Sequence, residues 1–367
     1  MRILIVGSGI AGLAVAKALE LKGFTPDVVD RFNTPPTSGQ GIFLLGNATR
    51  ALGELGLLDE VHRSSFPIAA QRILSATGKL LNDVATDSFW GACGPCLALP
   101  RRVLLDVLLS SLKRTRVSFG RAVIGTEGHA TVRTVDFEDG SRSEYDLVIG
   151  ADGVRSLLRS SAFADAHPRS LGLSCWRMVV RNPGHLDAWT AMLGKRRTAL
   201  AIPLNASDLY VYADCSTEEF ADGSIPTLKT LFADFGDPLG SMISSLPANV
   251  VIHRARLEEI PAGRYIADRL VIVGDGSHAS SPSMAQGAGM AIEDAIALAD
   301  SLAGASSIDL ALDRYYKRRK ARVEWVQKQC HARDKLRMAP NAVRNLLLRH
   351  VGNALYRRSY EPLTERF

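Results

Sequence analysis

The two ends of the chain share one pattern, in which a short apolar run is followed by helical spacing. Residues 2–6 form a mostly apolar, β-branched run, residues 13–21 repeat leucine and alanine with helical spacing, and residues 27–30 again favour a strand. A short continuous apolar run of this kind is typical of a strand buried on both faces of a parallel sheet. The pattern returns at 269–274, where a strand leads through a glycine-rich loop into a helix over 287–303.

The middle of the chain is dominated by strand patterns. The apolar and polar alternation predicts a hairpin over 68–81 with Thr77-Gly78 in its turn, and strands over 116–124, 130–138, 143–150, 172–181, 189–203 and 208–215. Leucine spacing predicts helices over 46–62, 101–112 and 226–243, and a basic helical tail over 309–358.

This order predicts an α/β protein with two interleaved domains. We expect a Rossmann-like domain with an antiparallel-sheet domain inserted into it and helices at the C-terminus. The expected Rossmann-like domain is discontinuous and comprises residues 1–65, 96–165 and 266–320. The expected sheet domain comprises residues 66–95 and 166–265, and a C-terminal helical segment covers residues 321–367.

Composition favours an ordinary globular protein. Of 367 residues, 46% are hydrophobic and 22% charged, and no apolar run reaches the roughly 20 residues that cross a bilayer. The apolar N-terminus continues directly into the first helix, so we interpret it as part of the fold and expect a cytoplasmic protein without an integral membrane segment.

The chain is mildly basic, with 44 Lys and Arg against 38 Asp and Glu, a net charge of +6. Part of this excess lies in the tail, and we interpret that cluster as the solvated face of a helix: Arg314, Lys317, Arg318, Arg319, Lys320 and Arg322. No nucleic-acid reading motif accompanies it, so no nucleic-acid partner is expected.

Cysteine usage indicates neither a disulfide framework nor a metal site. Five cysteines suit a reducing compartment. Cys93-Gly94-Pro95-Cys96 has the spacing of a redox pair. The chain extends through Leu97–Pro100 before the next helix, however, so the first cysteine lacks the helix N-terminus that would lower its pKa, and a redox role is not favoured.

The first motif that carries chemistry is Gly7-Ser8-Gly9-Ile10-Ala11-Gly12, between the first strand and the first helix. Gly7 permits the tight turn, Gly9 a close approach to a pyrophosphate and Gly12 close helix–strand packing. The helix N-terminus offers free N–H groups to the phosphates. Asp30 ends the second strand, where its carboxylate can accept hydrogen bonds from a ribose. The motif predicts dinucleotide binding.

Two further strands end in an aspartate. Residues 146–150 lead into Asp152-Gly153-Val154-Arg155-Ser156-Leu157-Leu158-Arg159. Residues 269–273 lead into Gly274-Asp275-Gly276-Ser277-His278, with Pro282 beyond, and continue through Gln286 into Gly287-Ala288-Gly289-Met290. No second Gly-x-Gly-x-x-Gly follows a strand, which favours transient binding of NADH or NADPH.

Together the three motifs resemble those of the class A flavin-dependent aromatic monooxygenases, the para-hydroxybenzoate hydroxylase-like family, from residue 1 to about 330. The resemblance implies one bound FAD. It also implies NAD(P)H-driven hydroxylation or epoxidation of a small aromatic or polycyclic substrate through a flavin C4a-hydroperoxide. A dehydrogenase, or a non-catalytic flavoprotein without oxygenase activity, is the alternative. The protein is expected to be a monomer or homodimer.

The resemblance also implies a set of cofactor-binding residues. Asp275 is expected to hold the ribityl and phosphate region, Asp152 to serve both FAD and NAD(P)H, and Arg101, or else Arg102, to lie near the pyrophosphate. Gly276 stands where alanine is usual and Asp30 where glutamate is usual. The full set is Gly7, Gly9, Ile10, Ala11, Gly12, Asp30, Arg31, Gly41, Ile42, Arg101, Val123, Asp152, Gly274, Asp275, Pro282, Gly287, Ala288, Gly289 and Met290.

The flavin and substrate surroundings follow from the same resemblance. The helix that begins at Gly287 is expected to stabilise negative charge on the flavin, and Pro282 to form the wall beside its reactive face. His278 is expected to be structural. The sequence identifies no catalytic base. Four residues of the inserted sheet are candidates for the substrate pocket: Trp176, Arg177, Tyr210 and Tyr212.

Overall fold

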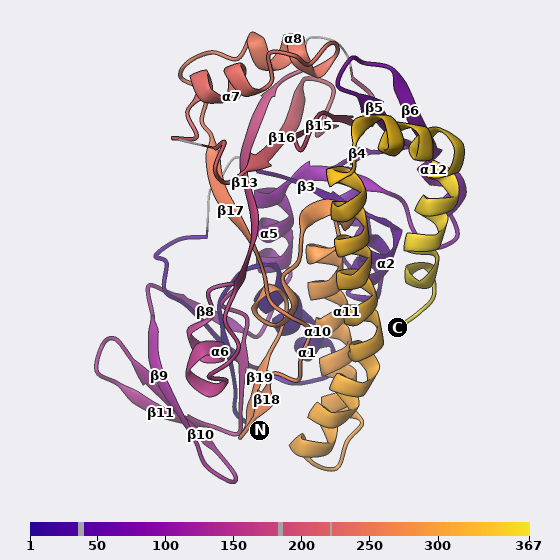
Figure 1. Cartoon of the computed structure of the whole chain (residues 1–367). Helices are drawn as coiled ribbons and strands as arrows, with labels where there is room; N and C mark the ends of the chain where they lie inside the picture. The colour runs from indigo at the N-terminus through magenta and orange to yellow at the C-terminus, as the bar shows by residue number, and fades with distance from the viewer. Residues whose placement is uncertain (36–39, 183–185, 221) are drawn as a thin grey trace.

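A computed structural model describes residues 1–35, 40–182, 186–220 and 222–367. Its first layer is a six-stranded sheet in the order β18-β19-β12-β1-β2-β8 (Figure 1). The strands are β1 (Ile3–Val6), β2 (Asp27–Asp30), β8 (Arg116–Phe119), β12 (Leu147–Gly150), β18 (Ile266–Ala267) and β19 (Leu270–Ile272). All neighbours are parallel except β18 and β19, so the expected parallel layer from both chain ends is confirmed.

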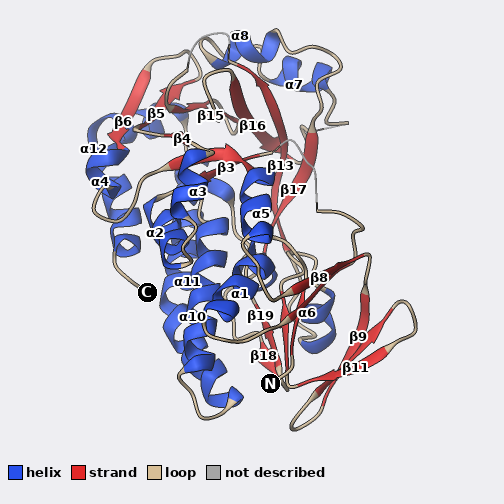
Figure 2. Ribbon diagram, turned by 180° about the vertical axis from the view of Figure 1, so that it is seen from behind, coloured by secondary structure: helices blue, strands red, loops and turns tan. Residues whose placement is uncertain are grey.

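Helices cover one face of this sheet and a small sheet the other (Figure 2). The helices are α1 (Ile10–Leu21), α5 (Arg101–Ser110) and α10 (Gly287–Ala303), and α1 packs along α10. The small sheet and helix α6 close the second face: β9 (Val123–Gly128), β10 (Arg133–Phe137), β11 (Arg142–Tyr145) and α6 (Leu157–Ala162). The parallel strands are buried on both sides, as their continuous apolar runs require.

The second large sheet has seven strands in the order β17-β13-β16-β15-β14-β5-β6. They are β5 (Ala70–Ser75), β6 (Leu80–Ala85), β13 (Arg169–Arg181), β14 (Trp189–Leu193), β15 (Thr198–Pro203), β16 (Asp208–Ser216) and β17 (His253–Glu259). One face is covered by α7 (Ile225–Leu231) and α8 (Leu239–Ser244). The other face meets β3 (Gly41–Leu44), β4 (Phe66–Pro67) and β7 (Leu97–Pro100), which form a third, three-stranded sheet.

Two long helices complete the chain. α11 (Ile308–Met338) runs beside α10 from the region of β18 toward the seven-stranded sheet, and α12 (Asn341–Thr364) packs against β6 (Figure 1). The remaining short helices are α2 (Gly46–Glu54), α3 (Leu58–Arg63), α4 (Thr86–Trp90), α9 (Asp275–His278) and η1 (Pro282–Met284). No helix in the described ranges is both long and apolar enough to span a bilayer.

The α/β fold with an inserted antiparallel sheet is confirmed, and the exact domain limits stay a prediction. Several expected elements are split. The helix over 46–62 breaks at Gly56, whose φ is +72°. The helix over 226–243 is interrupted between Leu231 and Leu239, with Pro238 directly before its second part. The tail is divided at Pro340, because proline lacks the backbone N–H that would continue the preceding helix. The segments 116–124, 143–150 and 189–203 each contain two strands.

Candidate functional site

The first strand end forms an open cradle. Gly7 has a φ of +107°, and a Cβ atom there would overlap the carbonyl of Ala151. A Cβ at Gly12 would overlap the carbonyl of Gly7, whereas one at Gly9 would meet nothing within 4 Å. The loop is therefore pressed against β12 while Gly9 borders open space at the N-terminus of α1. This is the arrangement a pyrophosphate requires.

Asp30 lies beside this cradle. One carboxylate oxygen accepts hydrogen bonds from the backbone N–H and the hydroxyl of Ser8, both at 2.7 Å, and the other accepts from the N–H of Phe32 at 2.9 Å. Ser8 thus holds the carboxylate at the end of β2, next to the glycine loop. Arg31 is exposed, and its guanidinium lies 5.0 Å from the ring of Phe32.

The second strand end holds a carboxylate with one free oxygen. Asp152 accepts from the N–H groups of Leu157 and Leu158 at 2.8 and 3.3 Å through Oδ2, while Oδ1 is buried and has no partner in the described part of the chain. Burial raises the pKa of Asp152. An orphaned buried oxygen is costly unless a ligand satisfies it, so this atom fits a hydroxyl donor such as those of FAD.

The third strand end lies directly against the first. Gly274 has φ +60° and ψ −145°, and a Cβ there would lie 2.7 Å from the Cβ of Ala11. Arg159, from the second motif, is buried and donates a 2.7 Å hydrogen bond to the carbonyl of Gly276. All three motifs therefore meet at one edge of the sheet. Asp275 is exposed there, with Oδ1 3.6 Å from a Cβ built on Gly287.

A buried ionic network, which the sequence does not reveal, supports this edge. The Nε of Arg319 donates to Asp294 at 2.8 Å and its Nη1 donates to Glu293 at 2.6 Å. Glu293 also accepts from Arg322 at 2.8 Å and from Asn47 at 3.0 Å. The interpretation of the basic tail as a solvated face is therefore wrong for Arg319 and Arg322, because both neutralise buried acids of α10.

His278 lies beneath the loop as a structural residue. Its Nε2 is 2.6 Å from Oδ2 of Asp294, which also accepts the N–H of Gly274 at 2.9 Å. Burial opposes the charged form of His278, but the carboxylate of Asp294 outweighs it and raises the pKa of the imidazole. Burial would likewise raise the pKa of Asp294, yet His278 and Arg319 lower it to about 2.

The C-terminal helices hold the Pro282 loop. Ser281 donates to Asp334 at 3.1 Å, Arg333 donates to the carbonyl of Ser283 at 3.3 Å, and Tyr360 donates to the carbonyl of Met284 at 3.2 Å. Nearby, Met290 is buried and its carbonyl accepts from Arg319 at 3.2 Å. These bonds fix the loop that contains Pro282 to α11 and α12.

Three of the four sheet candidates lie together. Arg177 pairs with Tyr212, and Val179 with Tyr210, so these side chains share the face that meets β3. A Cβ on Gly41 would overlap Tyr210, whose pKa burial raises to about 12. Trp176 is not part of this group. It lies on the opposite face, fully buried against the α7–α8 layer, and its indole donates to the carbonyl of Gly223 at 2.6 Å.

Unpartnered polar atoms gather around the same face. Asp214 accepts from Tyr212 at 2.7 Å and from Arg337, and burial raises the pKa of Asp214. Nine buried side-chain polar atoms lack a partner within the described residues. Six of them belong to residues of this face, of the adjoining α11 or of the start of α5: Asp214 Oδ1, His253 Nε2, Arg333 Nε, Arg337 Nε and Nη2, and Arg101 Nε.

The remaining candidates are placed as follows. The backbone N–H of Arg101 donates to the carbonyl of Gln40 at 2.8 Å, which sets Arg101 beside Gly41, whereas Arg102 is exposed and paired with Asp106 at 3.3 Å. This favours Arg101 over Arg102. Others line the sheet edge or α1 and α10: Ile10 is buried, Ile42, Ala288 and Val123 are half-buried, and Gly289 lies against Ala48.

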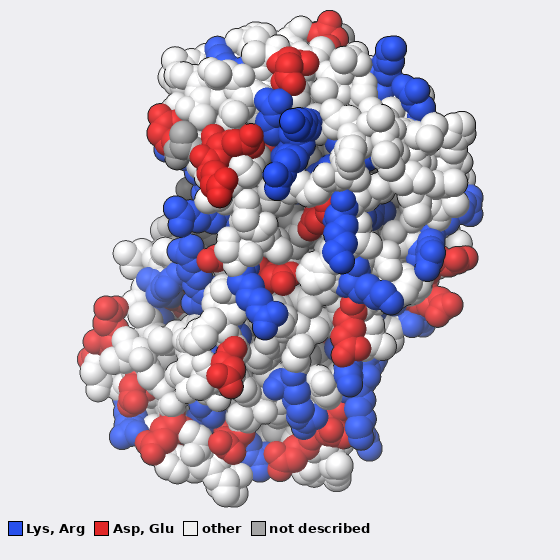
Figure 3. All heavy atoms as spheres, viewed as in Figure 1, with Lys and Arg blue, Asp and Glu red and all other residues white. Residues whose placement is uncertain are grey.

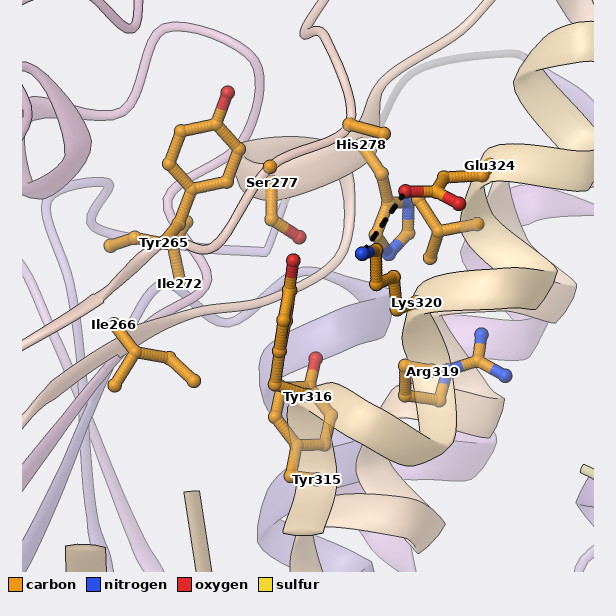
Figure 4. Close-up of a pocket in the computed structure, with 13 residues that line it drawn as sticks. Tyr265, Ile266, Ile272, Ser277, His278, Tyr315, Tyr316, Arg319, Lys320 and Glu324 are labelled. Atoms are coloured by element: carbon orange, nitrogen blue, oxygen red, sulfur yellow. Dashed lines mark ion pairs between the residues drawn. The ribbon is translucent and has the colours of Figure 1, made fainter. Parts of the chain in front are cut away.

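Two other features lie outside the glycine cradle. A small cavity of about 60 Å³ lies between β18 and α11, lined by Tyr265, Tyr315, Tyr316 and Lys320 (Figure 4). The glycines of the cradle do not line it, but it shares Ser277, His278 and Arg319 with the third motif and the buried ionic network. Cys93 and Cys96 are free thiols, and burial raises the pKa of Cys96 to about 12, so the structure gives no support to a redox role. No cluster of metal-ligating side chains occurs among the described residues.

The family model of an FAD binding domain matches residues 1–329. The chain belongs to this family of FAD-dependent monooxygenases. A 2-heptyl-3-hydroxy-4(1H)-quinolone synthase of Pseudomonas aeruginosa is 33% identical over 99% of this chain and 97% of the relative. An FAD-dependent urate hydroxylase of Klebsiella pneumoniae is 28% identical over 88% and 87%.

Solved structures agree on the fold. The structure of Klebsiella pneumoniae HpxO complexed with FAD and uric acid has a TM-score of 0.90, with 23% identity over 99% of this chain and 97% of that one. The structure of P. aeruginosa PqsL in complex with 2-aminobenzoylacetate has a TM-score of 0.84. This monooxygenase uses FAD, with NAD(P)H and O₂ as co-substrates, and the alternative of a flavoprotein without oxygenase activity is not favoured.

Proposed function

We propose that this monooxygenase hydroxylates a flat bicyclic ring that carries a carbonyl group, and that a 4-quinolone represents the substrate class. The observation that carries the proposal is the full-length similarity to the quinolone synthase, at 33% identity. An aurachin C monooxygenase/isomerase of Stigmatella aurantiaca, 27% identical over 86% of this chain, and a putative quinolone synthase of Rhodococcus erythropolis, 29% identical over 96%, also support it.

We place FAD across the three strand ends. The open side of Gly9 would face the pyrophosphate, Asp30 a ribose, and the orphaned Oδ1 of Asp152 a hydroxyl. The orphaned Nε of Arg101 provides a charged donor toward the phosphates. The N–H groups of α10 at Gly287 would stabilise negative charge on the flavin ring. Bound FAD supplies the electrons taken from NAD(P)H and the activation of O₂.

The substrate is placed between the Pro282 loop and the face of β13 and β16. Tyr210 offers an aromatic surface for a flat ring, and Arg177 offers a cation for a carbonyl or enolate oxygen. Aliphatic side chains of Val179 and Leu200 belong to the same apolar cluster and would keep water from the ring. Arg177 and the orphaned nitrogens of Arg337 are the donors we expect to recognise the substrate oxygen.

We infer that Asp214 accepts the proton that the substrate loses. Attack on an electron-rich ring gains from removal of an N–H or O–H proton, because the charge left behind raises electron density at the attacked carbon. Tyr212 donates to Asp214, so its oxygen retains lone pairs that can accept a substrate proton while its own proton passes to the carboxylate. The raised pKa of Asp214 suits such a proton acceptor.

The test is substrate-dependent turnover. FAD-loaded protein is mixed with NADH or NADPH and either a 2-alkyl-4(1H)-quinolone or uric acid, and both cofactor oxidation and product mass are followed. We expect the quinolone to stimulate oxidation and to gain one oxygen atom. Arg177→Gln should raise the KM for the quinolone, whereas the exposed control Arg102→Gln should not. Stimulation by uric acid alone, or oxidation that yields only peroxide with the quinolone, would contradict the proposed substrate class.

A further inference from the structure

The outer face of α12 exposes a cluster of large hydrophobic side chains. Four of the twelve exposed large hydrophobic side chains among the described residues lie on it: Val343 at 53%, Leu346 at 59%, Leu347 at 41% and Val351 at 40%. Their spacing of three, four and eight residues places them in one stripe along the helix. Figure 3 shows a mainly white surface at the first part of α12, with Lys and Arg at its margins and both acidic and basic side chains toward the C-terminal end of the helix.

Positive charge continues the apolar stripe toward the C-terminus of the helix. Arg349, Arg357 and Arg358 are exposed, and α12 contains one acidic residue, Glu361, which is exposed near its C-terminal end. On a helix, positions 350, 354, 357 and 358 extend the stripe that begins at Val343. The outer face therefore combines aliphatic side chains in its first turns with arginines in its later turns.

The rest of the molecule holds this helix rigidly. Arg344, on the inner face, is fully buried and donates to the carbonyls of Leu193 and Gly194 at 2.9 and 2.7 Å. Tyr356 accepts a 2.8 Å hydrogen bond from the indole of Trp90, and Tyr360 donates to the carbonyl of Met284. The outer stripe is thus a fixed surface, and its helix is bonded directly to the loop that contains Pro282.

We propose that α12 is an interfacial helix that docks the protein on an anionic lipid surface. A helix face with Leu and Val in its first turns and Arg in its later turns binds in the plane of a bilayer, through apolar burial and attraction to acidic headgroups. The proposal is independent of the substrate assigned above.

Charge argues against a second copy of the chain as the occupant. In a parallel pair of α12 helices the arginines of both copies would meet. In an antiparallel pair the arginine end of each copy would cover the aliphatic end of the other, which would desolvate unpaired charges. A surface of anionic headgroups over an apolar layer satisfies both ends of the stripe at once.

The experiment is co-sedimentation of the FAD-loaded full chain with vesicles. Vesicles of phosphatidylcholine mixed with phosphatidylglycerol are compared with vesicles of phosphatidylcholine alone, at low and high salt. We expect stronger binding to the anionic vesicles, weakened by salt. Leu346→Ser with Leu347→Ser should lower the partition coefficient roughly thirtyfold, because two half-exposed leucines no longer insert. Arg357→Gln with Arg358→Gln should lower it roughly thirtyfold on anionic vesicles only.

Controls make each outcome decisive. Val251→Ser removes a side chain that is 72% exposed outside α12 and should leave binding unchanged. Val343→Ser is a milder change that tests the same stripe if the double leucine variant does not fold. Failure of the parent protein to sediment with anionic vesicles, or equal sedimentation of parent and stripe variants, would overturn the proposal. So would concentration-dependent self-association that the leucine changes abolish, since the stripe would then join two copies.

Discussion

Replacement of Arg319 tests most sharply how the cofactor edge is held, that is, the edge of the six-stranded sheet where the motifs after β1, β12 and β19 meet. Its side chain is buried, and it donates hydrogen bonds to Asp294, Glu293 and the carbonyl of Met290 at 2.8, 2.6 and 3.2 Å. Arg319→Met keeps much of the apolar volume but leaves two buried carboxylates short of a cation. Breaking a buried pair by removing one partner typically destabilises by about 3–5 kcal/mol. We expect a loss of that size in the free energy of unfolding.

The neighbouring arginine provides a matched control. Arg318 donates to Asp300 at 2.9 Å, but both side chains are about one-third exposed. Exposed ion pairs contribute about 0–1 kcal/mol, so Arg318→Met should change the stability little. Arg319→Lys should lie between the two, because lysine keeps the charge and loses the forked geometry.

The assay is urea unfolding of the apoprotein and of the FAD-loaded protein, together with an FAD titration followed by flavin fluorescence. Asp294 also holds the N–H of Gly274, so Arg319→Met should weaken FAD binding in addition to lowering stability. If Arg319→Met and Arg318→Met cost the same within about 1 kcal/mol, the network does not support the cofactor edge and the reasoning is wrong.

Three further predictions follow from single residues. Gly9→Val should weaken FAD binding and leave apoprotein melting unchanged, whereas Gly12→Val should lower the melting temperature itself, because only the latter overlaps backbone. The pKa of His278 is raised in the folded protein, so its stabilising contribution is complete below pH ~6.5, the pKa of an unperturbed imidazole, and is lost as the pH rises through the higher folded pKa. His278→Gln should remove this pH dependence from the free energy of unfolding measured in urea, and an unchanged pH dependence would refute the assignment. Asp214→Asn should lower kcat by about 10²–10⁴ and remove the acid limb of its pH profile, which in the parent should lie above the usual range of an aspartate; a retained limb would exclude Asp214 as proton acceptor.

Local patterns predict the cofactor edge well. The strand at residues 27–30 and the helix from Gly287 to Ala303 lie where the sequence places them. The roles of the motif glycines are predictable because each allows a backbone conformation that other residues rarely adopt, such as the positive φ of Gly7 and Gly274. Gly56 was harder to interpret, because the leucines on both sides continue the helical spacing across it.

Long-range partners could not be predicted in the same way. The hydrogen bond between Asn47 and Glu293 joins residues that are 246 positions apart in the sequence. No local sequence pattern connects these residues with each other or with Arg322. The sheet candidates contained a usable signal, since Trp176 and Arg177 are neighbours on a strand and must face opposite sides. One strand alone does not show which side faces the cofactor. That assignment required the pairing of β13 with β16 and the contact between Tyr210 and Gly41.

The central claim is that one FAD lies across three strand ends, and amide hydrogen exchange with and without FAD tests it most directly. We predict that FAD slows exchange in the loops after β1, β12 and β19 and at the start of α10, and leaves α7 and α8 unchanged. Protection confined to the cavity between β18 and α11, or at only one of the three loops, would contradict the claim.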